Sequence, residues 1–357
     1  MNRMRRPVVF VGGDYAVSAI LDDIAAQLRA RDITVIRGRI EEPPKITEYA
    51  PSEWPDLFAD ADIILISTRT RASRAMLEAA PKLRGLVFPT IGTDSVALAD
   101  AMDLGLIIGH APTPENFTGM AESTVMLMAA LFLDLSGKER MTRQNLPRQQ
   151  HRDMRARLVR GHTIGLIGMG RIARSVVSRL QGWDARIVAY DPYVPQSQAP
   201  EGVTMVDMPT LLSRSDLISI HVTLTDDTRH MIGAKELEQM KPNAYLINTA
   251  RGGAIDERAL IAALRSGKLG GAALDVFERE PLPADSPLRT MDNVMVISHI
   301  VGQVNDMHAS FVNAALENIT RILRNEAPLY VRNPDVLPAW QKRLARLDDP
   351  NGTGLEP

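Results

Sequence analysis

The chain has 357 residues, of which 45% are hydrophobic and 24% are charged, and its formal net charge is −2. The length suits two ordinary domains, and the balanced charge argues against a disordered polyelectrolyte and against a nucleic-acid binder with a basic surface. The sequence has no cysteine, which excludes disulfides, thiolate nucleophiles and zinc–thiolate sites. The longest apolar stretch, residues 125–133, is about half as long as a membrane-spanning helix. We therefore expect a soluble, cytoplasmic protein without a membrane partner.

Short apolar runs alternate with helix-length segments in the first third of the chain. The expected strands are residues 8–11, 33–36, 63–66, 86–88 and 106–108, and the expected helices include residues 18–30 and 72–80. The runs are apolar on both faces, which is typical of parallel strands covered by helices on each side. This part of the sequence predicts an α/β domain with a doubly wound parallel sheet.

A long helix is expected over residues 119–133, and a basic segment, residues 138–160, follows it with seven arginines and Lys138. The segment is open to two interpretations: a nucleic-acid patch, or a solvated helix face with a loop at a subunit or domain junction. Aromatic residues do not alternate with the arginines, as a surface that stacks bases would require. We favour the second interpretation and expect no nucleic-acid partner.

A second α/β series begins at Thr163. Its expected strands are residues 164–167, 186–189, 217–221, 244–247, 272–277 and 294–297. Six strands with intervening helices are typical of a dinucleotide-binding domain. Residues 304–324 have helical periodicity, and we expect this helix to return to the first domain. The predicted domains are therefore residues 1–112 with 305–335, residues 113–304, and a loose tail over 336–357.

A glycine turn follows the first strand of the second series. Residues 168–173 read G-x-G-x-x-A, after an apolar strand and before a helix-like segment. Gly168 would permit the tight turn, and Gly170 would let a pyrophosphate approach the free N–H groups at the helix N-terminus. Gly12 and Gly13, after the first strand of the chain, lack the second half of this motif.

A carboxylate ends the second strand of the same series. Asp191 is expected to accept hydrogen bonds from the adenosine ribose hydroxyls and to repel a 2′-phosphate, because no arginine or lysine is close in sequence. These residues favour NAD over NADP as the cofactor.

Three polar residues lie just past three further apolar runs: Arg251, Glu280 and His299. Arginine can bind a carboxylate through two parallel hydrogen bonds, and histidine can exchange a proton near neutral pH. A carboxylate behind the histidine would fix its tautomer and favour the imidazolium form. The three residue types together suit the reduction of a 2-keto acid. His221 is the alternative histidine, although it is expected nearer the cofactor.

The chain resembles the D-isomer-specific 2-hydroxyacid dehydrogenases, the family of D-3-phosphoglycerate dehydrogenase and glyoxylate/hydroxypyruvate reductase. The resemblance extends from about Ile63 to Pro334, and the stretches that carry it are residues 163–173, 190–192, 224–225, 247–253, 273–281 and 298–302. It implies a Rossmann NAD-binding domain inserted into a flavodoxin-like substrate domain, NAD as the cofactor without a metal, and a homodimer. It also implies that Arg251, Glu280 and His299 are the catalytic set.

The resemblance implies further site residues on both domains. The expected cofactor residues, besides the two glycines and Asp191, are Arg171, Ile172, Thr223, Thr249, Ala250, Asp275 and Gly302. The expected substrate residues are Arg69, Thr70, Gly92 and Thr93, together with Arg251. The loop over residues 88–94 has fewer glycines than the family usually has. Arg71 and Arg74 either bind a second anionic group, such as phosphate, or lie exposed on a helix, which we favour.

Two other functions compete with a 2-hydroxyacid dehydrogenase. An NADH-responsive binding protein of the corepressor type would share the fold, but the intact set of arginine, glutamate and histidine favours turnover. A formate dehydrogenase would share it too, but the relatives that act on formate carry glutamine where Glu280 stands.

Overall fold

The computed structural model describes residues 5–43, 45–150 and 154–349. The chain divides into two compact units, which we describe separately. Unit 1 is Met1–Glu115 with Asn305–Pro357, and unit 2 is Asn116–Val304. The sequence predicts changes of domain after residues 112 and 304, and the units change after Glu115 and Val304.

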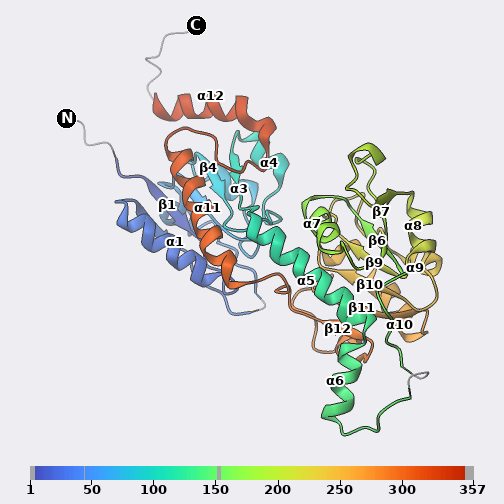
Figure 1. The fold of residues 1–357 in the computed structure, drawn as a ribbon. Coiled ribbons are helices and arrows are strands. Elements are labelled where there is room, and N and C mark those ends of the chain that lie inside the picture. Colours follow the sequence, from blue (N-terminus) through green and yellow to red (C-terminus); the bar gives the residue numbers. More distant parts are fainter. Residues whose placement is uncertain (1–4, 44, 151–153, 350–357) are drawn as a thin grey trace. The chain divides into compact units, whose positions relative to one another are not determined.

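Unit 1 is built on a five-stranded parallel sheet in the order β2-β1-β3-β4-β5. Figure 1 labels β1 and β4 of this sheet. Its strands are β1 (Val8–Val11), β2 (Thr34–Arg37), β3 (Ile63–Leu65), β4 (Gly85–Val87) and β5 (Ile107–Gly109). Its helices are α1 (Ser18–Ala30), α2 (Trp54–Phe58), α3 (Arg74–Glu78), α4 (Leu98–Asp103), α11 (Asn305–Leu323) and α12 (Leu337–Asp348). This order confirms the predicted doubly wound parallel sheet.

Successive side chains of these strands pack against opposite helix layers, because side chains alternate along a strand. Val9 packs with Leu21 of α1 and Ile319 of α11 in one core cluster, whereas Phe10 packs with Phe58 of α2 in the other. Both faces of the sheet are therefore buried, which explains the continuous apolar runs in the sequence.

The expected loose tail after residue 335 is wrong for the described part of that segment. Residues 337–348 form α12, where Trp340 is 2% exposed and donates from its indole Nε1 to the carbonyl of Arg84 at 2.7 Å. The helix packs its apolar side onto unit 1, and its buried residues belong to the same core cluster as α1 and α11. Residues 350–357 of the expected tail lie outside the described residues.

Unit 2 is built on a seven-stranded parallel sheet in the order β12-β11-β10-β9-β6-β7-β8. Figure 1 labels the strands of this sheet other than β8. Its strands are β6 (Thr163–Ile167), β7 (Arg186–Tyr190), β8 (Val203–Met205), β9 (Leu217–Ile220), β10 (Ala244–Asn248), β11 (Leu269–Leu274) and β12 (Val294–Val296). Its helices are α5 (Pro114–Phe132), which begins in unit 1, α6 (Leu135–Arg143), α7 (Arg171–Arg179), α8 (Met208–Arg214), α9 (Ala234–Gln239) and α10 (Glu257–Arg265). The prediction of six strands misses the edge strand β8.

Helices cover both faces of this sheet as well. Buried residues of α5 and α7 share one core cluster, and those of α8, α9 and α10 share the other. The chain runs outward from β6 in both directions, through β7 on one side and β9 on the other. Open α/β sheets bind ligands beside the carboxyl ends of their strands at such a reversal of strand order.

The described part of the basic segment contacts unit 2 itself. Arg140 pairs with Asp292 at 2.7 Å, and Arg157 donates to the carbonyl of Asn243 at 2.8 Å while stacking over Tyr245. These contacts agree with the interpretation of the segment as helix and loop, although residues 151–153 lie outside the described residues.

Among the described residues, no single helix is long and apolar enough to cross a bilayer. The helices α5 and α6 reach that length and composition only when they are taken together, and the chain bends between them.

Candidate active site

The turn between β6 and α7 has the backbone geometry that a pyrophosphate site needs. Gly168 has φ +90°, and a Cβ atom there would lie 2.7 Å from the carbonyl oxygen of His221. Gly170 precedes the first turn of α7, and a Cβ atom added to it meets no heavy atom within 4 Å. The open space beside Gly170 and the free N–H groups of α7 fit the pyrophosphate of a dinucleotide.

Asp191 follows β7 and lies against the same turn. Its Oδ2 accepts a hydrogen bond from the backbone N–H of Met169 at 2.8 Å, and its Oδ1 accepts one from Tyr193 at 2.9 Å. Each carboxylate oxygen has a second lone pair that a ribose hydroxyl can use. The arrangement places a negative charge beside the glycine turn. This charge favours NAD over NADP, because it repels the 2′-phosphate of NADP.

Arg251, Glu280 and His299 follow three neighbouring strands, β10, β11 and β12, at the carboxyl edge of the sheet. The structure brings two of them into contact: His299 Nδ1 lies 2.8 Å from Glu280 Oε2. The other carboxylate oxygen of Glu280 accepts the backbone N–H of Phe277 at 3.2 Å, which fixes the glutamate. Both side chains are partly exposed, His299 by 39% and Glu280 by 30%, so a ligand can reach them.

Asp275, directly after β11, holds the loop that carries His299. Its buried Oδ1 accepts the N–H groups of Ile300 at 2.9 Å and Val301 at 3.0 Å, and its carbonyl accepts the N–H of His299 at 2.7 Å. These bonds stabilise a left-handed conformation at His299, with φ +60°, which is uncommon outside glycine. Burial raises the pKa of Asp275, and the loop N–H groups partly offset that effect.

Arg251 begins the tight loop after β10. Its guanidinium donates to the carbonyl of Ala250 at 2.8 Å, and its own carbonyl accepts from the amide of Asn248 at 2.9 Å. The next residue, Gly252, packs so closely on the backbone of Phe277 that any larger residue would collide with it. This packing ties the arginine loop to the loop that carries Glu280.

His221, the alternative histidine, has a different environment. Its Nε2 lies 3.0 Å from the hydroxyl of Ser219, and desolvation lowers its pKa to about 4. His221 is therefore neutral at physiological pH and is a poor proton donor compared with a histidine that is paired with a carboxylate.

The remaining predicted cofactor residues line the same edge of the sheet. Arg171 and Ile172 open α7, and the Arg171 guanidinium lies over the ring of Phe117, 5.3 Å from its centroid. Thr249 Oγ1 lies 3.4 Å from Thr124 Oγ1 of α5. The others adjoin β9, β10 and β12: Thr223, Ala250 and Gly302. A Cβ atom at Gly302 would collide with Met120, so glycine is needed there for contact with α5.

The predicted substrate residues Arg69, Thr70, Gly92 and Thr93 belong to unit 1, at the carboxyl ends of β3 and β4. Thr70 is fully buried and donates to the carbonyl of Gly13 at 3.4 Å, so its side chain supports the backbone. Arg69 is partly exposed, with 28% of its side chain accessible. The sequence does not predict Asp14 as a site residue, although its side chain lies beside Arg69. The one sequence signal for Asp14 is that it is a polar residue just after a buried strand.

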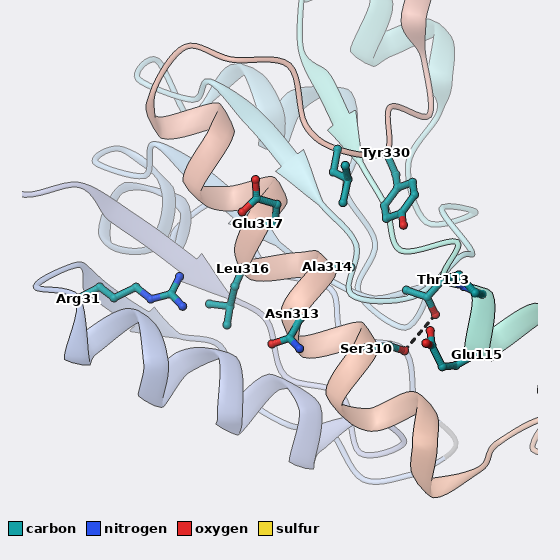
Figure 2. Close-up of a pocket in the computed structure, with 11 residues that line it drawn as sticks. Arg31, Thr113, Glu115, Ser310, Asn313, Ala314, Leu316, Glu317 and Tyr330 are labelled. Carbon is teal, nitrogen blue, oxygen red and sulfur yellow. Dashed lines mark hydrogen bonds between the residues drawn. The ribbon is translucent and has the colours of Figure 1, made fainter.

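A groove of about 470 Å³ lies elsewhere in unit 1 (Figure 2). Its described lining comes from α11, the start of α5, and the segments after α1, before α5 and after α11: Arg31, Thr113, Pro114, Glu115, Ser310, Asn313, Ala314, Leu316, Glu317, Leu329 and Tyr330. Figure 2 shows the contact at its rim, where Thr113 Oγ1 lies 3.1 Å from Ser310 Oγ. None of these lining residues belongs to the predicted catalytic, cofactor or substrate sets.

Comparison with known proteins agrees with this geometry. Residues 125–301 match the family described as D-isomer specific 2-hydroxyacid dehydrogenase, NAD binding domain. The chain is 35% identical over 319 residues to a D-3-phosphoglycerate dehydrogenase of Methanocaldococcus jannaschii, with 88% of this chain and 60% of the relative covered. It is 34% identical over 311 residues to a glyoxylate reductase of Thermofilum pendens, with 84% of this chain and 91% of the relative covered.

The structure is also similar to that of a 2-hydroxyacid dehydrogenase from Ketogulonicigenium vulgare, with 29% identity, a TM-score of 0.76, and coverage of 92% of this chain and 98% of that chain. The glycine turn, the carboxylate behind it and these similarities confirm NAD as the cofactor. The chain belongs to the D-isomer-specific 2-hydroxyacid dehydrogenase family of NAD-dependent oxidoreductases.

Proposed function

We propose that the protein interconverts a D-2-hydroxy acid and its 2-keto acid, of the glyoxylate/hydroxypyruvate or 3-phosphoglycerate class. His299 acts as the acid–base residue, Glu280 as its partner, and Arg251 binds the substrate carboxylate. The observation that carries this proposal is the 2.8 Å contact between His299 Nδ1 and Glu280 Oε2, at the carboxyl edge of the sheet that also holds the glycine turn.

The contact on Nδ1 leaves the other ring nitrogen of His299, Nε2, as the position that exchanges a proton with substrate. In the direction of reduction, Nε2 gives its proton to the keto oxygen, and Glu280 stabilises the positive imidazolium beforehand. Arg251 binds the carboxylate through two parallel hydrogen bonds and thereby orients the keto carbon. Bound NADH supplies the hydride that arrives at that carbon.

The reverse direction uses the same groups. His299 accepts the hydroxyl proton as the hydride leaves C2, so one 2-hydroxy acid and NAD⁺ give one 2-keto acid, NADH and a proton. Among the candidate substrates, glyoxylate has the stronger support from the relatives. This chain spans 91% of the glyoxylate reductase of Thermofilum pendens but only 60% of the D-3-phosphoglycerate dehydrogenase of Methanocaldococcus jannaschii.

The test is oxidation of NADH with a panel of 2-keto acids, followed through NADH absorbance, with NADPH and formate plus NAD⁺ as separate arms. We expect turnover with NADH and a drop in kcat of ~10²–10⁴-fold in His299→Asn, because general acid catalysis is lost. His308→Asn is the matched control, since His308 pairs with Asp23 at 2.7 Å and its side chain is also 39% exposed.

Near-normal turnover in His299→Asn would refute the role of His299 as proton donor. Tight NADH binding without turnover on any keto acid would favour the corepressor-like alternative, and NAD⁺ reduction by formate would favour the formate dehydrogenase alternative.

We also propose that the protein is a homodimer, formed through α5, α6 and the segment after α6. Large apolar side chains lie exposed along this stretch: Met126, Leu133, Leu135, Leu146 and Leu158, with exposures between 43% and 67%. A run of exposed apolar residues on one part of a soluble domain is typical of a protein–protein interface. These residues all belong to unit 2.

A further inference from the structure

Unit 1 contains a buried carboxylate at the reversal of its own strand order. The order β2-β1-β3-β4-β5 reverses between β1 and β3, where open α/β sheets bind ligands. Asp14 follows β1 at this position, and its side chain is 1% exposed. A buried carboxylate is costly unless it is hydrogen-bonded and paired, so its partners define what it does.

The partners of Asp14 include a predicted substrate residue. One carboxylate oxygen accepts from the hydroxyl of Ser67 and lies 3.8 Å from Arg69 Nη1, and the other accepts the N–H of Ala16 at 2.7 Å. The guanidinium of Arg69 also lies over the ring of Tyr15, 5.2 Å from its centroid. Arg69 is thus held on one side by a charge and on one face by a ring.

The same carboxylate is linked to the loop that carries the other predicted substrate residues. The carbonyl of Ser67 accepts from the hydroxyl of Ser95 at 2.9 Å, and the N–H of Val96 donates to the carbonyl of Thr93 at 3.3 Å. A short chain of contacts therefore runs from Asp14 through Ser67 to the loop at Thr93.

The arginines around Arg69 are also paired with carboxylates. Arg71 lies 3.2 Å from Glu48, and Arg74 contacts Glu78, Asp100 and Asp103 at 3.0 to 3.4 Å. These ion pairs agree with the interpretation of Arg71 and Arg74 as exposed residues, but only Arg74 lies on a helix, α3, whereas Arg71 precedes it. The segment therefore presents one guanidinium, Arg69, whose charge is partly balanced by the buried carboxylate of Asp14, 3.8 Å from its Nη1. A doubly charged phosphate gains little from a balanced guanidinium, whereas a neutral polar group can still accept its hydrogen bonds.

We propose that Asp14 is a positioning residue for substrate recognition, acting through Arg69. It holds the guanidinium in place and balances its charge, and so favours small unphosphorylated 2-keto acids over their phosphate esters. This inference rests on the proposed function, because it names the substrate class of the same reaction.

The test compares Asp14→Asn with wild type on hydroxypyruvate and on its phosphate ester. Asparagine keeps the shape and the acceptor for Ala16 but removes the charge. We expect KM for hydroxypyruvate to rise about 10-fold with kcat changed by less than about 3-fold, as expected for one charge-assisted contact. We also expect the ratio of kcat/KM for the phosphate ester over hydroxypyruvate to rise about 10-fold, because Arg69 then carries an unbalanced charge.

Asp62→Asn is the matched control. Asp62 is also buried in unit 1 and pairs with Arg5 at 2.8 Å, but it precedes β3, at the opposite end of the sheet. This variant should lower thermal stability and leave the selectivity ratio unchanged. NADH affinity should be the same in both variants, because the cofactor residues belong to unit 2.

A second variant shows whether Asp14 acts through Arg69. If it does, Asp14→Asn should change neither KM nor selectivity when made in an Arg69→Ala background. Three outcomes would each overturn the inference. They are additive losses of kcat/KM in the double variant, an unchanged selectivity ratio in Asp14→Asn, and equal losses of kcat/KM on both substrates together with lowered stability. If the wild-type protein oxidises NADH with neither substrate, the proposed function itself fails, and the inference fails with it.

Discussion

Two glycines in the turn between β6 and α7 are glycine for different physical reasons. Gly168 has φ +90°, and a Cβ atom there would lie 2.7 Å from the carbonyl oxygen of His221, so its own fold excludes a side chain. Gly170 has an ordinary φ of −77° and open space around it. Only the bound cofactor would occupy the space that a side chain at Gly170 would fill.

These two positions should separate stability from cofactor binding. Gly168→Ala should lower the free energy of unfolding by about 1–3 kcal/mol, because alanine is strained at this φ. Gly170→Val should leave the thermal midpoint of the cofactor-free protein unchanged. It should weaken NADH binding by ~10-fold or more, since at least one charge-assisted hydrogen bond to the pyrophosphate is lost.

The measurements are thermal unfolding without cofactor and titration of NADH by fluorescence. Wild-type NADH affinity in Gly170→Val would show that the pyrophosphate does not lie against this turn.

At the residue scale, the sequence predicts which side chains follow the strands but not the contacts that fix them. Glu280 and His299 stand after apolar runs, so their meeting at one sheet edge can be expected from the strand pattern alone. The positive φ of His299 and the hydrogen bonds that the loop N–H groups donate to Asp275 depend on the close packing of two loops, which no local pattern encodes. Asp14 and Arg69 lie 55 residues apart in sequence (69 − 14), and only the pairing of β1 with β3 brings them together.

At the element scale, segments with a clear apolar pattern were predictable, including the edge strands β2, β5 and β12, whereas segments whose apolar residues are separated by polar ones were not. The helix α1 and the strand β1 have the bounds that their apolar patterns predict. The strand β8 has three residues and lies at a sheet edge, so it lacks the apolar run that identifies the inner strands. The helix α12 does carry a signal, with Leu337, Trp340 and Leu344 at helical spacing, but polar neighbours and a proline obscure it.

The packing of α12 predicts that it is part of the fold of unit 1. Trp340→Ala should lower the stability of this unit by about 3–5 kcal/mol, because a large buried ring is removed from its core. Lys342→Ala, at an exposed position of the same helix, is the control and should have little effect. Calorimetry measures the transition, and NADH affinity should stay at its wild-type value. Unchanged unfolding of Trp340→Ala would show that α12 adds nothing to the core.

At the scale of the whole molecule, the proposed dimer surface can be tested by introducing charge. Wild-type protein should elute with about twice the chain mass of 39.3 kDa in size-exclusion chromatography with light scattering. The double variant Leu135→Glu/Leu158→Glu should elute as a monomer, because buried carboxylates without partners are strongly disfavoured at an interface. Leu329→Glu, a similarly exposed leucine of unit 1, should remain a dimer. A dimeric double variant would place the interface on another surface.

The interrupted order of unit 1 along the chain has a consequence during synthesis. Translation delivers the chain from its N-terminus, so all of unit 2 is made before α11 and α12 exist. The buried residues Val9 and Ile63 of β1 and β3 pack against α11 in the finished protein. This face of the first sheet to be made is therefore without its covering helix until α11 has left the ribosome, whereas the NAD-binding unit has its full complement of strands earlier.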